Sequence, residues 1–362
     1  MTATVTVSPV TMGDGASIGN DVFRRRALRR VILLIALCFG VVATSVVSLL
    51  VGQFEIPLRE LPRILLLGPM GVSDLSESVI WQIRIPRVVL GLLVGAALGV
   101  GGALMQAVFA NPLAEPSVIG VTSGAGVGAA AAIVFGWNFL GASTTPFLAF
   151  IAGLLTTVVV YGLARFDGSI RVINLILVGI AVNAVAGAAI SFLVFLAPTT
   201  SREQIVFWQM GSLGGAQWSH VSVVSVIVAV GIAVALFLGR HLDVLSLGDK
   251  AASHVGVDVG RLRAVAIITA TMLTAAAVSY AGLIGFVGLI VPHIIRTIAG
   301  PSNHLILPAS ALGGAVLIGL ADIAARTVIP FADLPIGIFT ALVGGPTFFI
   351  LLRRMMRKGH GR

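Results

Sequence analysis

The fold of this chain is decided by residues 84–128, which read RIPRVVLGLLVGAALGVGGALMQAVFANPLAEPSVIGVTSGAGVG. Two apolar segments are joined there by the polar, proline-marked hexapeptide at residues 111–116. Glycines recur at four-residue spacing in both segments, at positions 91, 95 and 99 and again at 120, 124 and 128. Residues i and i+4 lie on one face of a helix, so each segment carries a groove without side chains, and such grooves let helices approach closely in lipid. The stretch predicts a tightly packed helical hairpin inside a membrane.

The composition of the whole chain agrees with a membrane location. Of its 362 residues, 57% are hydrophobic and 10% are charged, and the mean hydropathy is +1.07. A soluble domain carries about 25% charged residues. Apolar runs of about 20 residues are typical of transmembrane helices, whereas outer-membrane strands give alternating segments of about 10 residues. We therefore expect an all-α polytopic membrane protein.

Hydropathy and helix breakers predict about ten spans in one domain, residues 31–352. Residues 1–30 and 353–362 are expected to be cytoplasmic tails, the first 23 residues being polar and featureless. Residues 201–215 predict a short interfacial helix and turn, and the eighth span is short and interrupted by Pro292. The predicted spans are residues 31–51, 85–107, 114–135, 146–164, 172–197, 219–239, 264–283, 285–299, 305–326 and 334–352.

The basic residues predict the orientation of these spans. Most of the 23 lysines and arginines fall in segments on the side of the termini, which places both termini in the cytoplasm. The net charge of +9 is thereby explained by topology, and no nucleic-acid-binding motif accompanies it. The exceptions, on the outer side, are Arg59, Arg63, Arg84, Arg87, Arg202 and Arg326.

Three of the outer arginines need a further explanation. Arg84 and Arg87 lie three residues apart on one helical face, and Glu77 is the only acid near them in the sequence. They predict a surface for an acidic partner. Arg326 follows Asp322 by four residues, and two interpretations stay open: the two side chains neutralise each other at a helix end, or they serve function.

Residues 240–263 form the longest inner connection. Within it, residues 249–254 favour a short helix bracketed by Gly248 and Gly256. The segment is either a solvated loop or a surface helix that docks a cytoplasmic partner.

The sequence lacks the usual marks of an enzyme. It contains no G-x-x-x-x-G-K-[ST] segment for ATP, and the glycines of residues 124–128 lie inside an apolar span, where helix packing explains them. The six histidines show no metal-site spacing, no Ser/His/Asp set is evident, and Cys38 is the one cysteine. His293, after Pro292, is expected to be a buried hydrogen-bonding residue. Apart from Asp322, acids are nearly excluded from the spans, which argues against a proton- or sodium-driven carrier.

Several blocks, in order along residues 30–354, resemble the FecCD-type permeases of ABC importers for ferric siderophores, haem and cobalamin. The matching residues are Arg84-Ile85-Pro86-Arg87, Gly102, Gln106, Asn111-Pro112-Leu113-Ala114-Glu115-Pro116, Gly120, Trp208-Gln209-Met210-Gly211 with Trp218, Leu247-Gly248 through Gly256, the Gly282–His293 block with Pro292, Asp322, Arg326 and Leu334-Pro335-Ile336-Gly337. The resemblance implies the type II ABC importer permease architecture. It also implies that Gln106, Asn111, Pro112, Glu115, Trp208, Met210, Gly211, Pro292, Asp322 and Pro335 serve structure or the pathway.

The resemblance also implies partners. The permease would form a homodimer with two ATP-binding cassette subunits beneath it and a substrate-binding protein outside, in a bacterial cytoplasmic membrane. Arg84, Arg87 and Arg326 would meet acidic residues of the binding protein. The ATPase would contact Leu247, Gly248, Asp249, Ala252, Val255 and Gly256. No cofactor or metal is expected on this chain, and magnesium ATP would bind the partner subunit.

The substrate is left open between iron chelates, either haem or a ferric siderophore, and cobalamin, with a lean to the iron chelates from the stretch between Trp208 and Trp218. The alternatives are a zinc or manganese importer permease, an ion-coupled secondary carrier and an intramembrane enzyme.

Overall fold

The computed structural model describes residues 14–359 apart from 55, 70–73, 167–168 and 171. The chain is helical almost throughout, and the only strands in the described part are the two-residue pair Arg165–Phe166 (β1) and Ser169–Ile170 (β2). The all-α prediction is confirmed. The helices are α1 (Asp14–Leu50), α2 (Leu61–Leu67), α3 (Leu75–Ser78), the π-helical η2 (Val79–Arg84), α4 (Ile85–Val108), the 3₁₀ turn η3 (Pro116–Ile119), α5 (Val121–Val134), the 3₁₀ turn η4 (Gly141–Ser143), α6 (Thr144–Leu163), α7 (Val172–Leu196), α8 (Thr199–Met210), α9 (Trp218–Leu245), α10 (Asp249–His254), α11 (Val259–Ala281), α12 (Val287–Ala299), α13 (Asn303–Thr327) and α14 (Ile336–Gly359).

Eight segments of the described chain are long and apolar enough to cross a membrane. They overlap with eight of the predicted spans and correspond to α1 from Ala27 on, α4 with the preceding turns, α6, α7, α9, α11, α13 and α14 up to Arg353. The third and eighth predicted spans are the shorter apolar helices α5 and α12, of 14 and 13 residues. The chain is therefore a multi-pass membrane protein in which two of the ten helices do not reach full span length.

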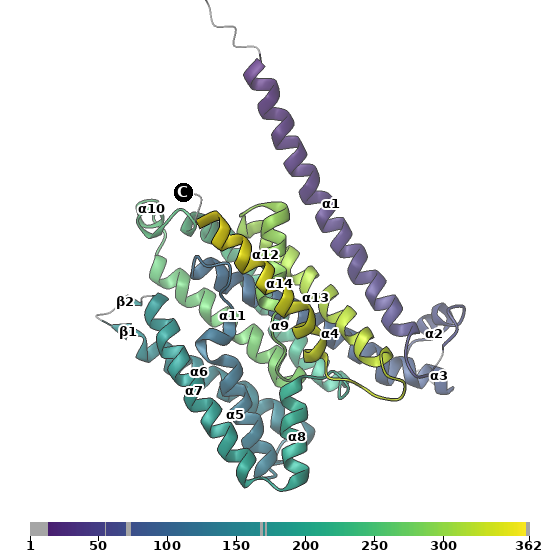
Figure 1. Cartoon of the computed structure of the whole chain (residues 1–362). Helices are drawn as coiled ribbons and strands as arrows, with labels where there is room; N and C mark the ends of the chain where they lie inside the picture. The colour runs from purple at the N-terminus through teal and green to yellow at the C-terminus, as the bar shows by residue number, and fades with distance from the viewer. Residues whose placement is uncertain (1–13, 55, 70–73, 167–168, 171, 360–362) are drawn as a thin grey trace, which may run out of the picture.

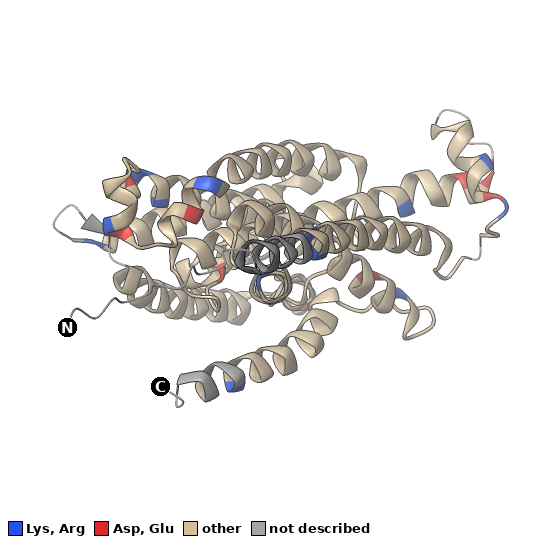
Figure 2. Cartoon of the chain, turned by 90° about the horizontal axis from the view of Figure 1, so that it is seen from above, with Lys and Arg blue, Asp and Glu red and all other residues tan. Residues whose placement is uncertain are grey.

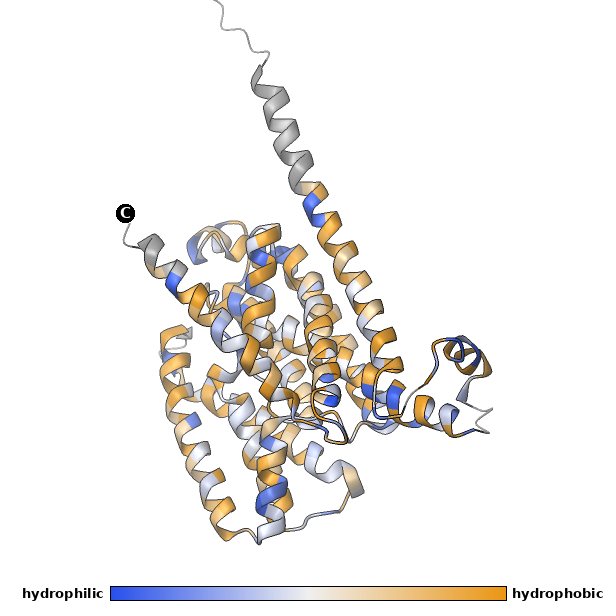
Figure 3. Ribbon diagram, turned by 45° about the vertical axis from the view of Figure 1, so that its right-hand side comes forward, coloured by the Kyte–Doolittle hydropathy of each residue, from blue (hydrophilic) through white to orange (hydrophobic). Residues whose placement is uncertain are grey.

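The helices form one bundle with α10 at one end and α8 at the other (Figure 1). We call these the α10 end and the α8 end. In α4 and α11, 72% of the most hydrophobic stretch is buried inside the bundle. In α7 and α14 the corresponding share is 17%. Figure 3 shows that the outer helices are coloured mainly as hydrophobic along their length. The bundle thus has two central helices and an apolar outer surface, as a lipid environment requires.

The close approach predicted from the glycine spacing is present, but the predicted hairpin is wrong. A Cβ at Gly95 would meet the backbone of Gly314 on α13, and a Cβ at Gly102 would meet the backbone of Gly288 on α12. The groove of α5 faces α6, where a Cβ at Gly128 would meet the carbonyl of Leu148. The groove of α4 is therefore filled by α12 and α13, far along the chain, and that of α5 by the next helix, α6, so α4 and α5 do not fill each other's grooves.

Three predicted boundaries also differ. The featureless tail expected at residues 1–23 lies only partly outside the described residues, and helix α1 begins at Asp14. The third span does not start at residue 114, because Pro116 opens a separate 3₁₀ turn that ends at the left-handed Gly120 (φ 84°). Helix α9 continues to Leu245, so the connection predicted at residues 240–263 is largely helical.

Candidate functional site

The three outer arginines predicted as a partner surface lie together at the α8 end. Arg84 and Arg87 stand at the start of α4, and Arg326 lies in the last turn of α13. The side chains of Arg87 and Arg326 are 9% and 11% exposed. A buried guanidinium is stable only when it is paired and hydrogen-bonded. The partners of each arginine therefore indicate its role.

Arg87 binds two carboxylates. Its Nε lies 2.8 Å from Oδ1 of Asp322, and its Nη1 and Nη2 donate to the two oxygens of Asp333 at 2.7 Å each. The paired contact to Asp333 is the bidentate geometry that suits a guanidinium to a carboxylate. The side chain of Asp322 is 4% exposed and that of Asp333 is 37% exposed, so one acid is internal and the other faces outward.

The other two arginines bind backbone carbonyls at the end of α1. Arg84 donates to the carbonyls of Leu49, Leu50 and Phe54. Arg326 donates to the carbonyls of Ser48 and Val51, at 3.2 Å each, and its Nε lies 3.1 Å from Asp322. Carbonyls at a helix C-terminus lack intrahelical donors, so these arginines also cap α1.

Glu77 is near Arg84 and Arg87 in the sequence, but it is not the only acid that the fold brings to this cluster. Asp322 and Asp333 are brought to Arg87 from 235 and 246 residues away along the chain. The predicted neighbours Asp322 and Arg326 do form an ion pair, and Asp322 also pairs with Arg87, which the sequence did not predict. Docking by these arginines stays a prediction, and it now has to account for their internal partners.

Beside this network, three backbone segments cross at glycines. The N–H of Ser212 donates to the carbonyl of Ala281 at 2.8 Å, and the N–H of Ile336, which follows Pro335, donates to the carbonyl of Gly211 at 2.9 Å. Gly211 has φ 74°, a conformation that glycine adopts without strain. A Cβ at Gly337 would meet the carbonyl of Met210. The connector after α8 is thus bound to the end of α11 and to the start of α14.

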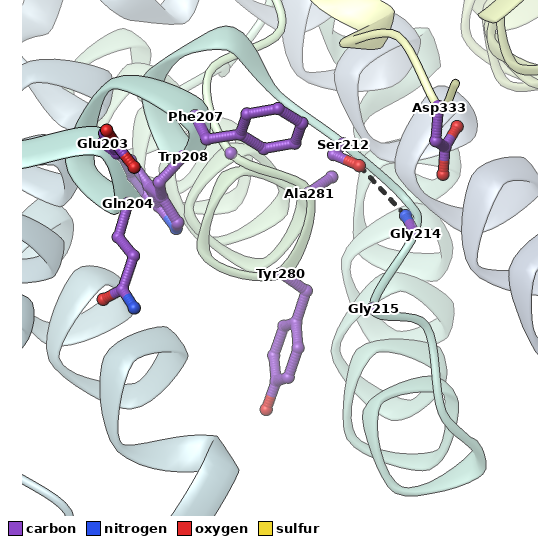
Figure 4. A pocket seen from close by; sticks show the side chains of 11 residues that line it. Glu203, Gln204, Phe207, Trp208, Ser212, Gly214, Gly215, Tyr280, Ala281 and Asp333 are labelled. Carbon is purple, nitrogen blue, oxygen red and sulfur yellow. Dashed lines mark hydrogen bonds between the residues drawn. The ribbon is translucent and has the colours of Figure 1, made fainter. Parts of the chain in front are cut away.

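A cavity of about 550 Å³ opens next to this crossing (Figure 4). Helix α8 supplies Glu203, Gln204, Phe207 and Trp208 to it, and Asp333 lies on the far side beside Gly214. Its lining is completed by Ser212, Gly214, Gly215, Tyr280, Ala281 and Gly282. The ring of Tyr280 lies 5.0 Å from that of His220. Aromatic faces with a few polar groups are typical of a ligand pocket.

The predicted polar joint lies at the α10 end. After α4, Ala110 takes φ 48°, and Oδ1 of Asn111 accepts the N–H of Leu113 at 3.0 Å. Pro112 lies within this turn, and Glu115 accepts the hydroxyl of Ser117 before Pro116 starts η3. Glu115 also lines a smaller cavity of about 140 Å³ with Thr274 and Phe286. The joint reverses the chain between two spans, and Glu115 is its one acidic side chain.

Gln106 and Pro292, two predicted site residues, are related through the carbonyl of Gly288. Pro292 lies inside α12 and has no N–H, so it cannot donate to the carbonyl of Gly288 four residues earlier. The side-chain amide of Gln106 donates to the carbonyls of Gly288 and Leu289, at 3.3 and 3.0 Å. The buried amide therefore satisfies backbone that the proline leaves open.

The short helix predicted at residues 249–254 is confirmed as α10. Gly248 and Gly256 flank it with φ 105° and 86°. Ala252 is fully buried, whereas Leu247 and Val255 are 74% and 68% exposed. Asp249 forms two hydrogen bonds with Arg263 on α11, at 2.8 and 2.9 Å. The segment is an ordered surface helix with exposed apolar side chains at both ends. The interpretation as a solvated loop is therefore excluded.

Charged residues are sparse over the rest of the chain (Figure 2). A bundle of spanning helices with an ordered helix at one end and a cavity beside an ion-pair network at the other defines a membrane transport subunit. The chain matches the FecCD transport family over residues 39–354 and belongs to that family. It is therefore a permease of an ABC importer.

Relatives in the family carry different substrate names. The chain is 42% identical over 283 residues to the cobalamin import system permease protein BtuC of Halobacterium salinarum, covering 78% of this chain and 75% of the relative. It is 38% identical over 308 residues to the hemin transport system permease protein HmuU of Yersinia pestis, covering 81% and 92%. A solved structure of an ABC transporter in an inward-facing conformation, assigned to the metal-chelate type, matches with a TM-score of 0.77 and 32% identity, over 89% of this chain and 99% of that one.

Sequence reasoning missed Asp333 and Tyr280. Asp333 follows Asp322 by 11 residues in the connector between α13 and α14 and shows no spacing that marks it. Its position just before the Leu334-Pro335-Ile336-Gly337 block was the available clue. Tyr280, near the end of α11, is one of only two tyrosines in the chain, and that rarity could have drawn attention to it.

Proposed function

We propose that this permease imports iron chelates, haem or a ferric siderophore, by alternating access across a cytoplasmic membrane. It works as a homodimer with two ATP-binding cassette subunits and an extracytoplasmic substrate-binding protein. The termini and α10 face the cytoplasm, and the α8 end faces outward. Magnesium ATP binds the cassette subunits.

The observation that supports a bulky chelate rather than a bare metal ion is the cavity at the α8 end. Phe207, Trp208 and Tyr280 offer aromatic faces to a volume of about 550 Å³. Such a lining suits a bulky chelate with apolar faces and is poorly suited to a bare metal ion, which requires oxygen, nitrogen or sulfur ligands. The match to a metal-chelate type transporter and to a hemin permease supports the same class.

The two ends of the bundle support the assembly. At the α10 end, the exposed Leu247 and Val255 offer an apolar contact to the cassette subunit, and Asp249–Arg263 ties α10 to α11. At the α8 end, Arg84, Arg87 and Arg326 form the basic cluster that meets acidic residues of the binding protein. ATP-driven closure of the cassettes moves α10, and the pathway opens on one side at a time.

Cobalamin is the second candidate, because a cobalamin permease is among the relatives, at 42% identity. Corrin and porphyrin rings both present broad conjugated faces, so the cavity lining does not separate them. An ion-coupled secondary carrier has less support, because acids are nearly absent from the spans.

The test is ATP hydrolysis by the complex reconstituted in nanodiscs with its cassette and binding proteins. Haem, a ferric siderophore and cobalamin are offered in turn. Stimulation by haem or the siderophore supports the proposal, and stimulation by cobalamin alone replaces it with the second candidate. Ligand uptake that continues without the cassette subunit would favour the secondary carrier.

A pair of variants separates the role of the cavity in transport from general effects of losing an aromatic ring. Phe207→Ala, on the cavity wall, is expected to lower transport of the stimulating ligand several-fold. Phe39→Ala, on the peripheral helix α1 and 71% exposed, removes the same ring from the outer surface and is expected to change nothing.

A further inference from the structure

Residues 56–69 form a small arm after α1, which we call the lateral arm. Ile56, Leu61 and Ile64 are buried against Ile80 in a hydrophobic cluster separate from the main core. Trp81 reinforces this contact, because its Nε1 donates to the carbonyl of Ile64 at 3.1 Å. The arm is therefore packed against η2 in a fixed position.

The outward face of the arm is as apolar as its packed face. Helix α2 reads LPRILLL, and Leu66 beside its buried residues is 88% exposed. Leu58, Leu65 and Leu67 are 65%, 41% and 49% exposed. Large apolar side chains gathered on an exposed face normally lie against another surface, so this face is expected to have an occupant.

The position of the arm identifies the occupant. In Figures 1 and 2 the arm projects sideways from the bundle next to the end of α1, away from α8. A binding protein docked on Arg84, Arg87 and Arg326 would lie near the η2 side of the arm, and the test below separates it from lipid as the occupant of the outward face. The face continues the exposed apolar surface of α1, where Val42 and Val46 are 61% and 38% exposed. That surface faces lipid in a spanning helix.

The charges of the arm fit the same environment. Arg59 and Arg63 are exposed beside the leucines, and Glu60 between them is half-buried. Arginines at the edge of an apolar face reach phosphate groups while their stems stay in the apolar layer. This pattern is typical of a segment that lies in the membrane interface.

We infer that the lateral arm is a lipid-binding surface: its leucines enter the membrane interface at the α8 end, and Arg59 and Arg63 bind lipid phosphates. The inference does not depend on the imported substrate or on the identity of the binding protein.

The test places spin labels on the full chain in nanodiscs of mixed neutral and anionic phospholipid. Native Cys38, exposed on α1, is the lipid reference. Leu66→Cys and, as the aqueous reference, Ser253→Cys on the exposed side of α10 are each made in a Cys38→Ser background. Leu66 is so exposed that the substitution removes little packing.

Collisions with oxygen and with a water-soluble nickel chelate give the outcome. At Leu66 we expect high oxygen accessibility, and nickel accessibility several-fold below that at Ser253 and above that at Cys38, which lies in the middle of a span. Nickel accessibility equal to that at Ser253 overturns the inference, as does protection that appears only when a binding protein is added. Arg59→Gln with Arg63→Gln is expected to raise nickel accessibility at Leu66 in anionic nanodiscs, and no change there overturns the role of the arginines.

Discussion

Arg87 at the start of α4 holds the carboxylate of Asp333 in two hydrogen bonds of 2.7 Å, across 246 residues of sequence. Asp333 is the more exposed of the two acids bound to Arg87, and its backbone neighbours connect it to the glycine crossing under the cavity. A carboxylate on a docking partner would therefore compete with Asp333 for the same guanidinium edge, while Asp322 stays in place.

Replacing Asp333 is expected to strengthen docking. In Asp333→Asn the internal competitor loses its charge, and a binding protein that uses Arg87 should bind about tenfold tighter, a change of about 1.4 kcal/mol. The measurement is binding-protein affinity for the nanodisc-reconstituted importer, at low and at high salt. Asp249→Asn, at the α10 end, is the matched control and should leave the affinity unchanged. An affinity that falls or stays constant in Asp333→Asn would remove Arg87 from the docking surface.

The contact between Arg87 and Asp333 also shows what a single sequence can and cannot predict. The bounds of α10 were predicted because Gly248 and Gly256 bracket the segment in the sequence, and both glycines take a positive φ in the structure. The glycine spacing of α4 predicted a close approach but assigned it to the wrong helix, because a groove does not say which helix fills it. Asp333 was missed for the same reason, since its contact with Arg87 exists only after α4 and the α13–α14 connector meet.

The bond between Gln106 and the carbonyls near Pro292 predicts a compensating pair. Gln106→Leu leaves the carbonyl of Gly288 without a donor and should destabilise the protein by about 1–3 kcal/mol. Pro292→Ala restores a backbone N–H four residues after Gly288, so the same Gln106→Leu change should cost less in that background, by about 1 kcal/mol. Thermal unfolding of the four proteins in one detergent measures the coupling. Additive effects would mean that the amide and the proline act independently.

The approach of Gly102 to Gly288 predicts a severe effect of one methyl group. A Cβ at Gly102 would meet the backbone of Gly288, which cannot turn away as a side chain can. Gly102→Ala should therefore separate α4 from α12 and destabilise the protein by at least about 1–3 kcal/mol. Gly187→Ala on α7 is the control, because nothing lies within 4 Å of its Cβ position, and it should stabilise by up to about 1 kcal/mol. Equal melting temperatures for the two variants would contradict the close α4–α12 contact.

The exposed ends of α10 predict a variant that separates folding from assembly. Leu247 is 74% exposed and Val255 is 68% exposed, so Leu247→Asp and Val255→Asp remove little internal packing. Each should leave the melting temperature of the isolated permease within a few degrees, because a surface substitution usually changes stability by less than about 0.5 kcal/mol. Each should weaken association with the cassette subunit by tenfold or more, since a carboxylate would have to be buried in the apolar contact, at a cost of more than about 1.4 kcal/mol.

Ala252→Asp is the contrasting change, because Ala252 is fully buried and its substitution should unfold α10 itself. Co-purification of the cassette subunit and its ATP hydrolysis measure the result. Full assembly of the Leu247 and Val255 variants would place the cassette contact elsewhere on the α10 end.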